Sequence, residues 1–158
     1  MNNKGFTLIE LIIVIALLAV IALLTTPNII KMLEKNKIDN YNNTIDAIIE
    51  AAELYVSNNK YNLSFKDSEY NSDYCSPSDT KDVYAYITLQ HLIDSKDIKG
   101  EVKNYCTNGE VYPDEISIKI ILNCNTRNFS YELYDAGDSF FSDDNSQIIK
   151  IDDCSNLN

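Results

Sequence analysis

The N-terminal segment constrains this chain more than any other feature, because it is apolar over nearly the thickness of a bilayer. Between Phe6 and Leu24 the polar residues are Thr7 and Glu10. As a helix this stretch would be about 28 Å long, close to the ~30 Å hydrocarbon core of a membrane. A carboxylate in such a segment costs roughly 2.5–3.5 kcal/mol at mid-bilayer and less toward the interface, so Glu10 is expected to have a partner.

The residues around Glu10 form a recognisable motif. Lys4 and Gly5 precede Phe6, and the run KGFTLIE ends at Glu10. This start resembles that of a type IV prepilin, and the resemblance extends to Pro27. It implies that a leader is cut after Gly5 and that Phe6 becomes the N-methylated first residue. It further implies that assembly depends on the residues Glu10, Thr7 and Pro27.

Two other readings of the segment are less consistent with these residues. A secretory signal would have a shorter apolar core and a small-residue cleavage site after it, whereas Thr25, Thr26 and Pro27 follow here. A plain membrane anchor gives no reason for Gly5 and Phe6 to precede a glutamate. The distribution of basic residues does not favour an N-terminus on the cytoplasmic side of the membrane, because one lysine, Lys4, precedes the segment while three lysines follow it. The orientation therefore rests on the resemblance.

Helical periodicity continues after Pro27 with polar residues on the opposite side. The apolar positions, spaced mostly by three or four, are Ile30, Leu33, Ile38, Tyr41, Ile45, Ile48, Ala52 and Tyr55. We therefore expect one long helix from Phe6 to about Asn59, kinked or loosened by Pro27 between Leu23 and Pro27. The expected parts are a leader (1–5), a transmembrane and assembly helix (6–26), an amphipathic spine (27–59) and a head (60–158).

The head has the pattern of a small antiparallel sheet. Glu115 to Cys124 alternates apolar and polar residues, a turn follows at 125–128, and Phe129 to Leu133 reads as the returning strand. A third strand is expected at 147–151, an irregular connection at 58–82, and a short helix capped by Thr88. The expected fold class is α+β, with the long helix packed on the sheet.

Four cysteines lie beyond the apolar segment, at Cys75, Cys106, Cys124 and Cys154. An even number in a domain outside the membrane suggests disulfides, and four cysteines allow three pairings. The resemblance to pilins favours Cys124 with Cys154, which leaves Cys75 with Cys106. Four reduced, buried thiols are the alternative, and no C-x-x-C spacing suggests zinc.

Charge and motifs limit the chemistry. The formal net charge is −11, which argues against direct binding of nucleic acid. No catalytic or cofactor-binding motif is present, and His91 has no partner motif, so neither catalysis nor a cofactor is expected. An acidic loop from Asp135 to Asn145 is a candidate calcium site, with a solvated turn as the alternative. Its candidate ligands are Asp135, Asp138, Asp143 and Asp144.

The resemblance implies a structural subunit of a type IV pilus, which acts in adhesion, surface motility or aggregation. Its implied partners are identical or related pilin subunits, the prepilin peptidase and methyltransferase, and the pilus assembly machinery. The subunit would cross the membrane once before assembly and lie in an extracellular fibre afterwards. The alternatives are a pseudopilin of a type II secretion or DNA-uptake system and a ligand-binding minor pilin at a fibre tip.

Overall fold

The computed structural model describes residues 7–59, 63, 75, 82–99, 101–137 and 146–156. The chain divides into two units, residues 1–37 and residues 38–158, which are considered separately below. In the first unit the described residues are almost entirely helical. The second unit contains the sheet and the hydrophobic core.

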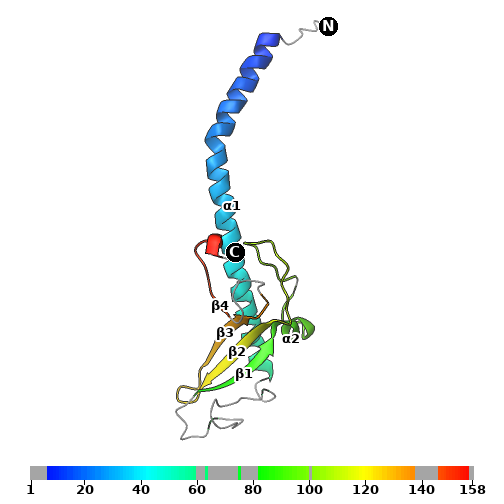
Figure 1. The fold of residues 1–158 in the computed structure, drawn as a ribbon, viewed down its shortest axis with the longest axis vertical. Helices are drawn as coiled ribbons and strands as arrows, with labels where there is room; N and C mark the ends of the chain where they lie inside the picture. Colours follow the sequence, from blue (N-terminus) through cyan, green and yellow to red (C-terminus); the bar gives the residue numbers. More distant parts are fainter. Residues whose placement is uncertain are drawn as a thin grey trace. The chain divides into compact units, whose positions relative to one another are not determined.

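The long helix predicted from the sequence is confirmed. Helix α1 spans Leu8–Asn59 and continues through Pro27 without a break in its assignment (Figure 1). Pro27 has no backbone N–H, so the carbonyl four residues earlier lacks its usual helical donor. Just before it, the Thr26 hydroxyl donates to the carbonyl of Ala22 at 2.6 Å. The helix is not interrupted at Pro27, and the kink or loosening expected there stays a prediction.

Four antiparallel strands form one sheet in the order β1-β2-β3-β4 (Figure 1). The strands are β1 (Asp82–Thr88), β2 (Ile116–Asn123), β3 (Phe129–Asp135) and β4 (Ser146–Ile148). The predicted β2–β3 hairpin is confirmed. Its turn is held by the Asn123 side chain, whose Oδ1 accepts from the backbone N–H of Thr126 at 2.8 Å.

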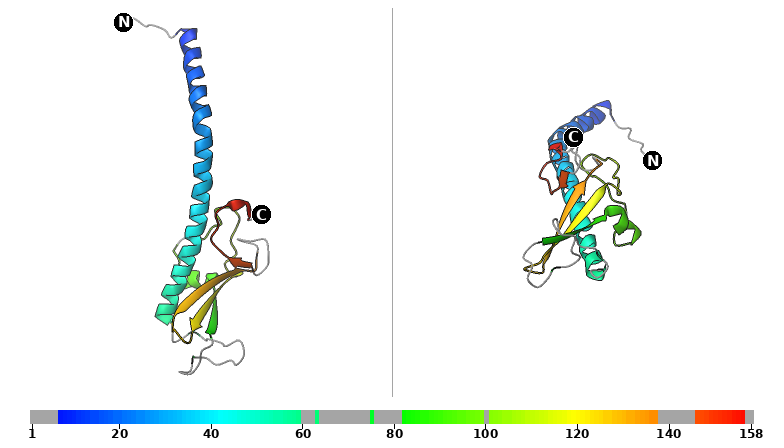
Figure 2. Two further views of the ribbon diagram at one scale, coloured as in Figure 1. Left: turned by 90° about the vertical axis from the view of Figure 1, so that its left-hand side faces the viewer. Right: turned by 60° about the horizontal axis from the view of Figure 1, so that its bottom comes forward.

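The part of α1 that belongs to the second unit, residues 38–59, runs along one face of this sheet (Figure 2). The predicted helix face supplies Tyr41, Ile45, Ile48 and Ala52, each at most 2 % exposed. The sheet contributes alternate residues of its strands, and the largest of these are Ile116, Ile118, Ile120 and Leu133. Burying each large aliphatic side chain contributes about 1.5–3 kcal/mol, so this helix–sheet contact is the main source of stability of the head.

Strand β1 was not expected from the sequence. Tyr84 and Tyr86 occupy its outward positions, where their apolar rings obscure the alternation of apolar and polar residues. Val83, Ala85 and Ile87 point inward and are buried. The amphipathic nature of tyrosine, an apolar ring with a polar tip, makes its side of a strand ambiguous from sequence. The predicted connection at 58–82 lies mostly outside the described residues.

The third predicted strand is shorter than expected. Strand β4 ends at Ile148, and the chain then binds α1 rather than β3. Asn42 accepts from the backbone N–H of Ile151 and donates to the carbonyl of the same residue, both at 2.9 Å. The side-chain amide thus satisfies the backbone groups that a continued strand would have paired.

The short helix capped by Thr88 is confirmed as α2 (Leu89–Asp94). The Thr88 hydroxyl accepts from the backbone N–H of His91 at 3.2 Å, and Leu89 and Leu92 are buried. His91 Nε2 lies 2.8 Å from the Tyr55 hydroxyl of α1. The sequence did not indicate this bond between the two helices.

The expected disulfide pairing is wrong, and so is the alternative of four reduced thiols. The structure joins Cys75 to Cys124 and Cys106 to Cys154, with Cα–Cα distances of 5.4 and 5.3 Å. The sheet explains the first bridge. Asp82 at the start of β1 pairs with Asn123 at the end of β2, so the start of β1 lies beside Cys124, and Cys75 is the cysteine nearest to that start in the sequence. Cys154 lies in the short 3₁₀ helix η1 (Cys154–Asn156) and is left to pair with Cys106.

Candidate assembly site

Thr7 and Glu10 close the N-terminal end of α1 with a reciprocal set of hydrogen bonds. Glu10 Oε2 accepts from the Thr7 backbone N–H at 3.1 Å and from the Thr7 hydroxyl at 3.0 Å. The Thr7 hydroxyl in turn accepts from the Glu10 backbone N–H at 3.4 Å. This is a capping box, in which a Thr before the helix and a Glu three residues later satisfy each other's backbone donors.

The capping box uses one of the two carboxylate oxygens of Glu10. Within the described part of the chain, Oε1 of Glu10 accepts no hydrogen bond. A carboxylate has acceptor capacity at both oxygens, so Oε1 remains available to a cation from outside the chain. The resemblance implied assembly roles for Thr7 and Glu10 but not the bonds between them, although the Thr-x-x-Glu spacing indicates those bonds.

The helix around this site has no apolar partner among the described residues. Its large side chains between Leu8 and Leu24 are 45–78 % exposed. By length and composition this is a helix able to cross a membrane, and none of its apolar window is buried against the rest of the described chain. Lipid or other helices must therefore cover it, because so large an apolar surface is strongly unfavourable in water.

The outward face of the sheet carries a connected group of tyrosines and charges. Lys119 Nζ lies 3.1 Å from Glu132 Oε2, and the Tyr134 hydroxyl donates to the same oxygen at 2.8 Å. Lys119 also lies 5.7 Å from the ring centre of Tyr84, which packs edge-on against Tyr86. The bond from Tyr134 and, after it, the bond and charge of Lys119 hold the pKa of Glu132 below its ordinary value.

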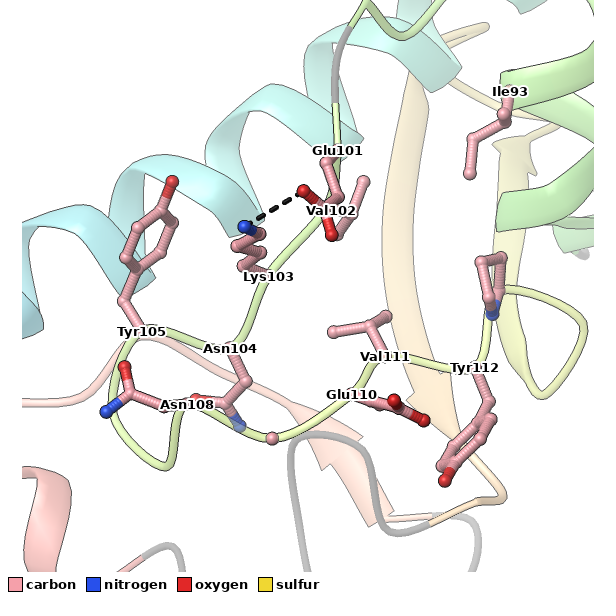
Figure 3. A pocket seen from close by; sticks show the side chains of 12 residues that line it. Ile93, Glu101, Val102, Lys103, Asn104, Tyr105, Asn108, Glu110, Val111 and Tyr112 are labelled. Carbon is pink, nitrogen blue, oxygen red and sulfur yellow. Dashed lines mark ion pairs between the residues drawn. The ribbon is translucent and has the colours of Figure 1, made fainter.

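The loop at 101–113 encloses an open hollow of about 740 Å³ beside α2 (Figure 3). Asn104 is buried and turns the loop by accepting from the backbone N–H groups of Cys106 and Thr107 at 3.0 and 3.2 Å. Glu101 and Lys103 form an exposed ion pair at 2.9 Å at its rim. The residues that line it include neither histidine nor cysteine, and they do not form a nucleophile–base pair.

The calcium prediction is not tested, because Asp138, Asp143, Asp144 and Asn145 lie outside the described residues. Asp135 is the last residue of β3 rather than part of an exposed loop, and it is fully buried. Its Oδ1 accepts from the backbone N–H of Gly137 at 3.0 Å. Over the described ranges, no three His, Cys, Asp or Glu residues are grouped to hold a metal ion.

Asp135 influences the buried phenol of Tyr41 on α1. Burial raises the pKa of Tyr41 well above its ordinary value, and the negative charge of Asp135 raises it further. Tyr131 on β3 is similarly affected, since burial and then the charge of Glu53 raise its pKa to about 12. These phenols stay neutral at physiological pH and have a structural rather than an acid–base character.

A comparison with known protein families finds a match at the N-terminus, in the segment that contains Thr7 and Glu10. Residues 1–26 match the family model described as the prokaryotic N-terminal methylation motif. The chain therefore begins with a type IV pilin-like class III signal peptide, and the motif indicates a structural, pilin-like precursor that is anchored in a membrane. Neither the comparison with curated proteins nor the comparison with solved structures gives a match.

Proposed function

We propose that this chain is a structural subunit of a type IV pilus and not an enzyme. Prepilin peptidase cuts it after Gly5, and the new amine of Phe6 is methylated. The subunit waits in the membrane, with α1 in lipid, until the assembly machinery moves it into a helical fibre. The apolar helices then form the fibre core and the acidic heads its surface.

The observation that carries the proposal is that Glu10, which follows the processing motif, has one carboxylate oxygen that accepts no hydrogen bond from the described residues. Hydrolysis of the Gly5–Phe6 bond adds water and leaves a carboxylate on Gly5 and an ammonium group on Phe6. In a fibre core without water, each charge needs a partner, since a lone buried charge is very unfavourable. No described residue donates to Oε1 of Glu10, so this atom can accept from the Phe6 ammonium group of a neighbouring subunit.

This pairing would select the register between subunits more than it would add stability. Burial removes both charges from water, so the net gain of the pair is small. A wrong register leaves both charges unpaired, and that cost makes the correct register specific. The capping box assists by holding the carboxylate at the end of the helix, where a neighbouring terminus can reach it.

Mass spectrometry of the mature N-terminus tests the processing directly. We expect a chain that starts with methylated Phe6, and recovery of the assembled protein with its leader still attached would contradict the proposal. Surface fibres that contain the protein along their length, seen by immunogold electron microscopy, would support a pilus subunit. Labelling confined to fibre tips would instead support a minor pilin, and a processed protein without surface fibres would support a pseudopilin.

Two substitutions separate the charge of Glu10 from its capping role. Glu10→Gln keeps an oxygen that can accept from Thr7 but removes the charge, whereas Glu10→Val removes both. We expect both variants to insert in the membrane and both to fail in fibre assembly. Glu34→Val, a change of an exposed acid farther along α1, is the matched control. Normal fibres from Glu10→Gln would show that the ion pair is not required.

A further inference from the structure

The part of α1 between the apolar segment and the head carries an uncovered surface of its own. Ile29, Ile30, Met32 and Leu33 are 50–64 % exposed although they lie outside the main apolar run. Lys31 and Lys35 are also exposed, one helical turn apart. Neither lysine forms an ion pair within the described part of the chain.

An opposite charge pattern lies farther along the same helix. Asp46 and Glu50 are also one turn apart on α1, with Asp46 half-buried. Glu50 is exposed and forms no ion pair with the described residues, while Asp46 pairs with Lys150 at 2.8 Å in an exposed contact. Such an exposed pair is worth little, so Asp46 can exchange its partner at small cost.

The two patterns match at one displacement between parallel copies of α1. A shift of 15 residues, about 22 Å along the helix, brings Lys31 level with Asp46 and Lys35 level with Glu50. A shift of 11 residues pairs Lys35 with Asp46 but sets Lys31 against Asn42. Other shifts likewise give these two lysines at most one acidic residue of the helix.

The same displacement also covers the exposed apolar residues. It brings Ile29 level with Val14 and Leu33 level with Leu18 of the other copy, both of which belong to the apolar segment. The apolar side chains beyond the segment would thus reach the helix bundle rather than water. Neighbouring shifts also place these side chains against the apolar segment, so apolar contact is compatible with the 15-residue displacement and the charges select it.

We propose that a second copy of this chain binds α1 in parallel with a 15-residue displacement, with Lys31 and Lys35 of one copy facing Asp46 and Glu50 of the other. This inference rests on the proposed fibre-forming function. The neighbouring subunit in this contact differs from the one whose Phe6 ammonium group pairs with Glu10. That pairing requires a displacement of about four residues. A helical fibre offers each subunit several such neighbours at different heights.

Charge reversal in the full-length chain tests the contact. The Lys35–Glu50 pair is the cleaner one, because no lysine among the described residues pairs with Glu50. We expect Lys35→Glu and Glu50→Lys each to lower the yield of fibres several-fold, and the double variant to restore it. Lys99→Glu, the same charge change at an exposed position outside α1, is the control and should assemble as the wild type does. Single variants that match this control, or a double variant no better than the singles, would overturn the proposal.

Cysteine cross-linking measures the displacement itself. Lys35→Cys combined with Glu50→Cys should give disulfide-linked oligomers in oxidised fibres. Lys35→Cys with Asn43→Cys, an eight-residue displacement between exposed positions, should give far fewer. The reverse order of yields would refute the 15-residue displacement and leave fibre formation unaffected. A wild-type chain that forms no fibres would instead refute the proposed function, and this register with it.

Discussion

The disulfide connectivity makes the strongest prediction, because the structure and the pilin resemblance disagree about it. The bridges Cys75–Cys124 and Cys106–Cys154 are separated by 49 and 48 residues. In the chain-entropy model, closing a loop of that length stabilises the folded state by about 4 kcal/mol. The two loops overlap, so the second bridge constrains a chain that the first already shortens and contributes less.

Trypsin places each cysteine in a separate peptide, so the pairing can be measured without mutation. The peptides are residues 67–81, 104–119, 120–127 and 151–158. We expect non-reducing digestion to yield 67–81 linked to 120–127 and 104–119 linked to 151–158. A species that joins 120–127 to 151–158 would refute the reasoning from the sheet register.

Paired substitutions test the same reasoning energetically. The double variant Cys106→Ser/Cys154→Ser removes one whole bridge and should cost up to about 4 kcal/mol in the free energy of unfolding. Its control, Cys75→Ser/Cys106→Ser, breaks both bridges and should cost more. Tyrosine near-UV circular dichroism during denaturant unfolding reports on the head, because all 11 tyrosines lie beyond residue 40. Equal stability of the two double variants would contradict the pairing.

Two further predictions concern contacts within the head. Asn42→Ala removes both bonds to the Ile151 backbone and leaves partly buried groups unsatisfied, so it should cost about 1–3 kcal/mol in the same unfolding assay; an unchanged midpoint would contradict that role. Glu132→Gln should destabilise the head at neutral pH, because the pKa of Glu132 is lowered by Tyr134 and Lys119. A lowered carboxyl pKa stabilises the fold above the ordinary value of 4.5 and loses this effect as the pH falls through the folded-state value. The difference between wild type and variant should therefore shrink below pH 4.5, and a difference that grows there would contradict the assignment.

Local patterns were sufficient to predict the elements whose residues lie close together in the sequence. The apolar segment and its motif predicted the N-terminal helix, since its composition alone requires cover by lipid or other helices. Strict alternation from Ile116 to Ile120 predicted β2, and the turn that follows predicted its hairpin with β3. The α+β class followed from these two features, because an amphipathic helix and a one-sided sheet must cover each other.

The tertiary structure decided what depends on residues far apart in the chain. The pairing of β1 with β2 and the bridge between Cys75 and Cys124 could not be predicted locally, because the tyrosines of β1 obscure its buried side. The end of β4 was set by Asn42, 109 residues before its partner Ile151. Asp135 looked like a solvated loop acid and is buried, because the register of β3 turns its side chain inward. Periodicity reports which face of an element is apolar, whereas the partner that covers that face is selected only when the whole chain packs.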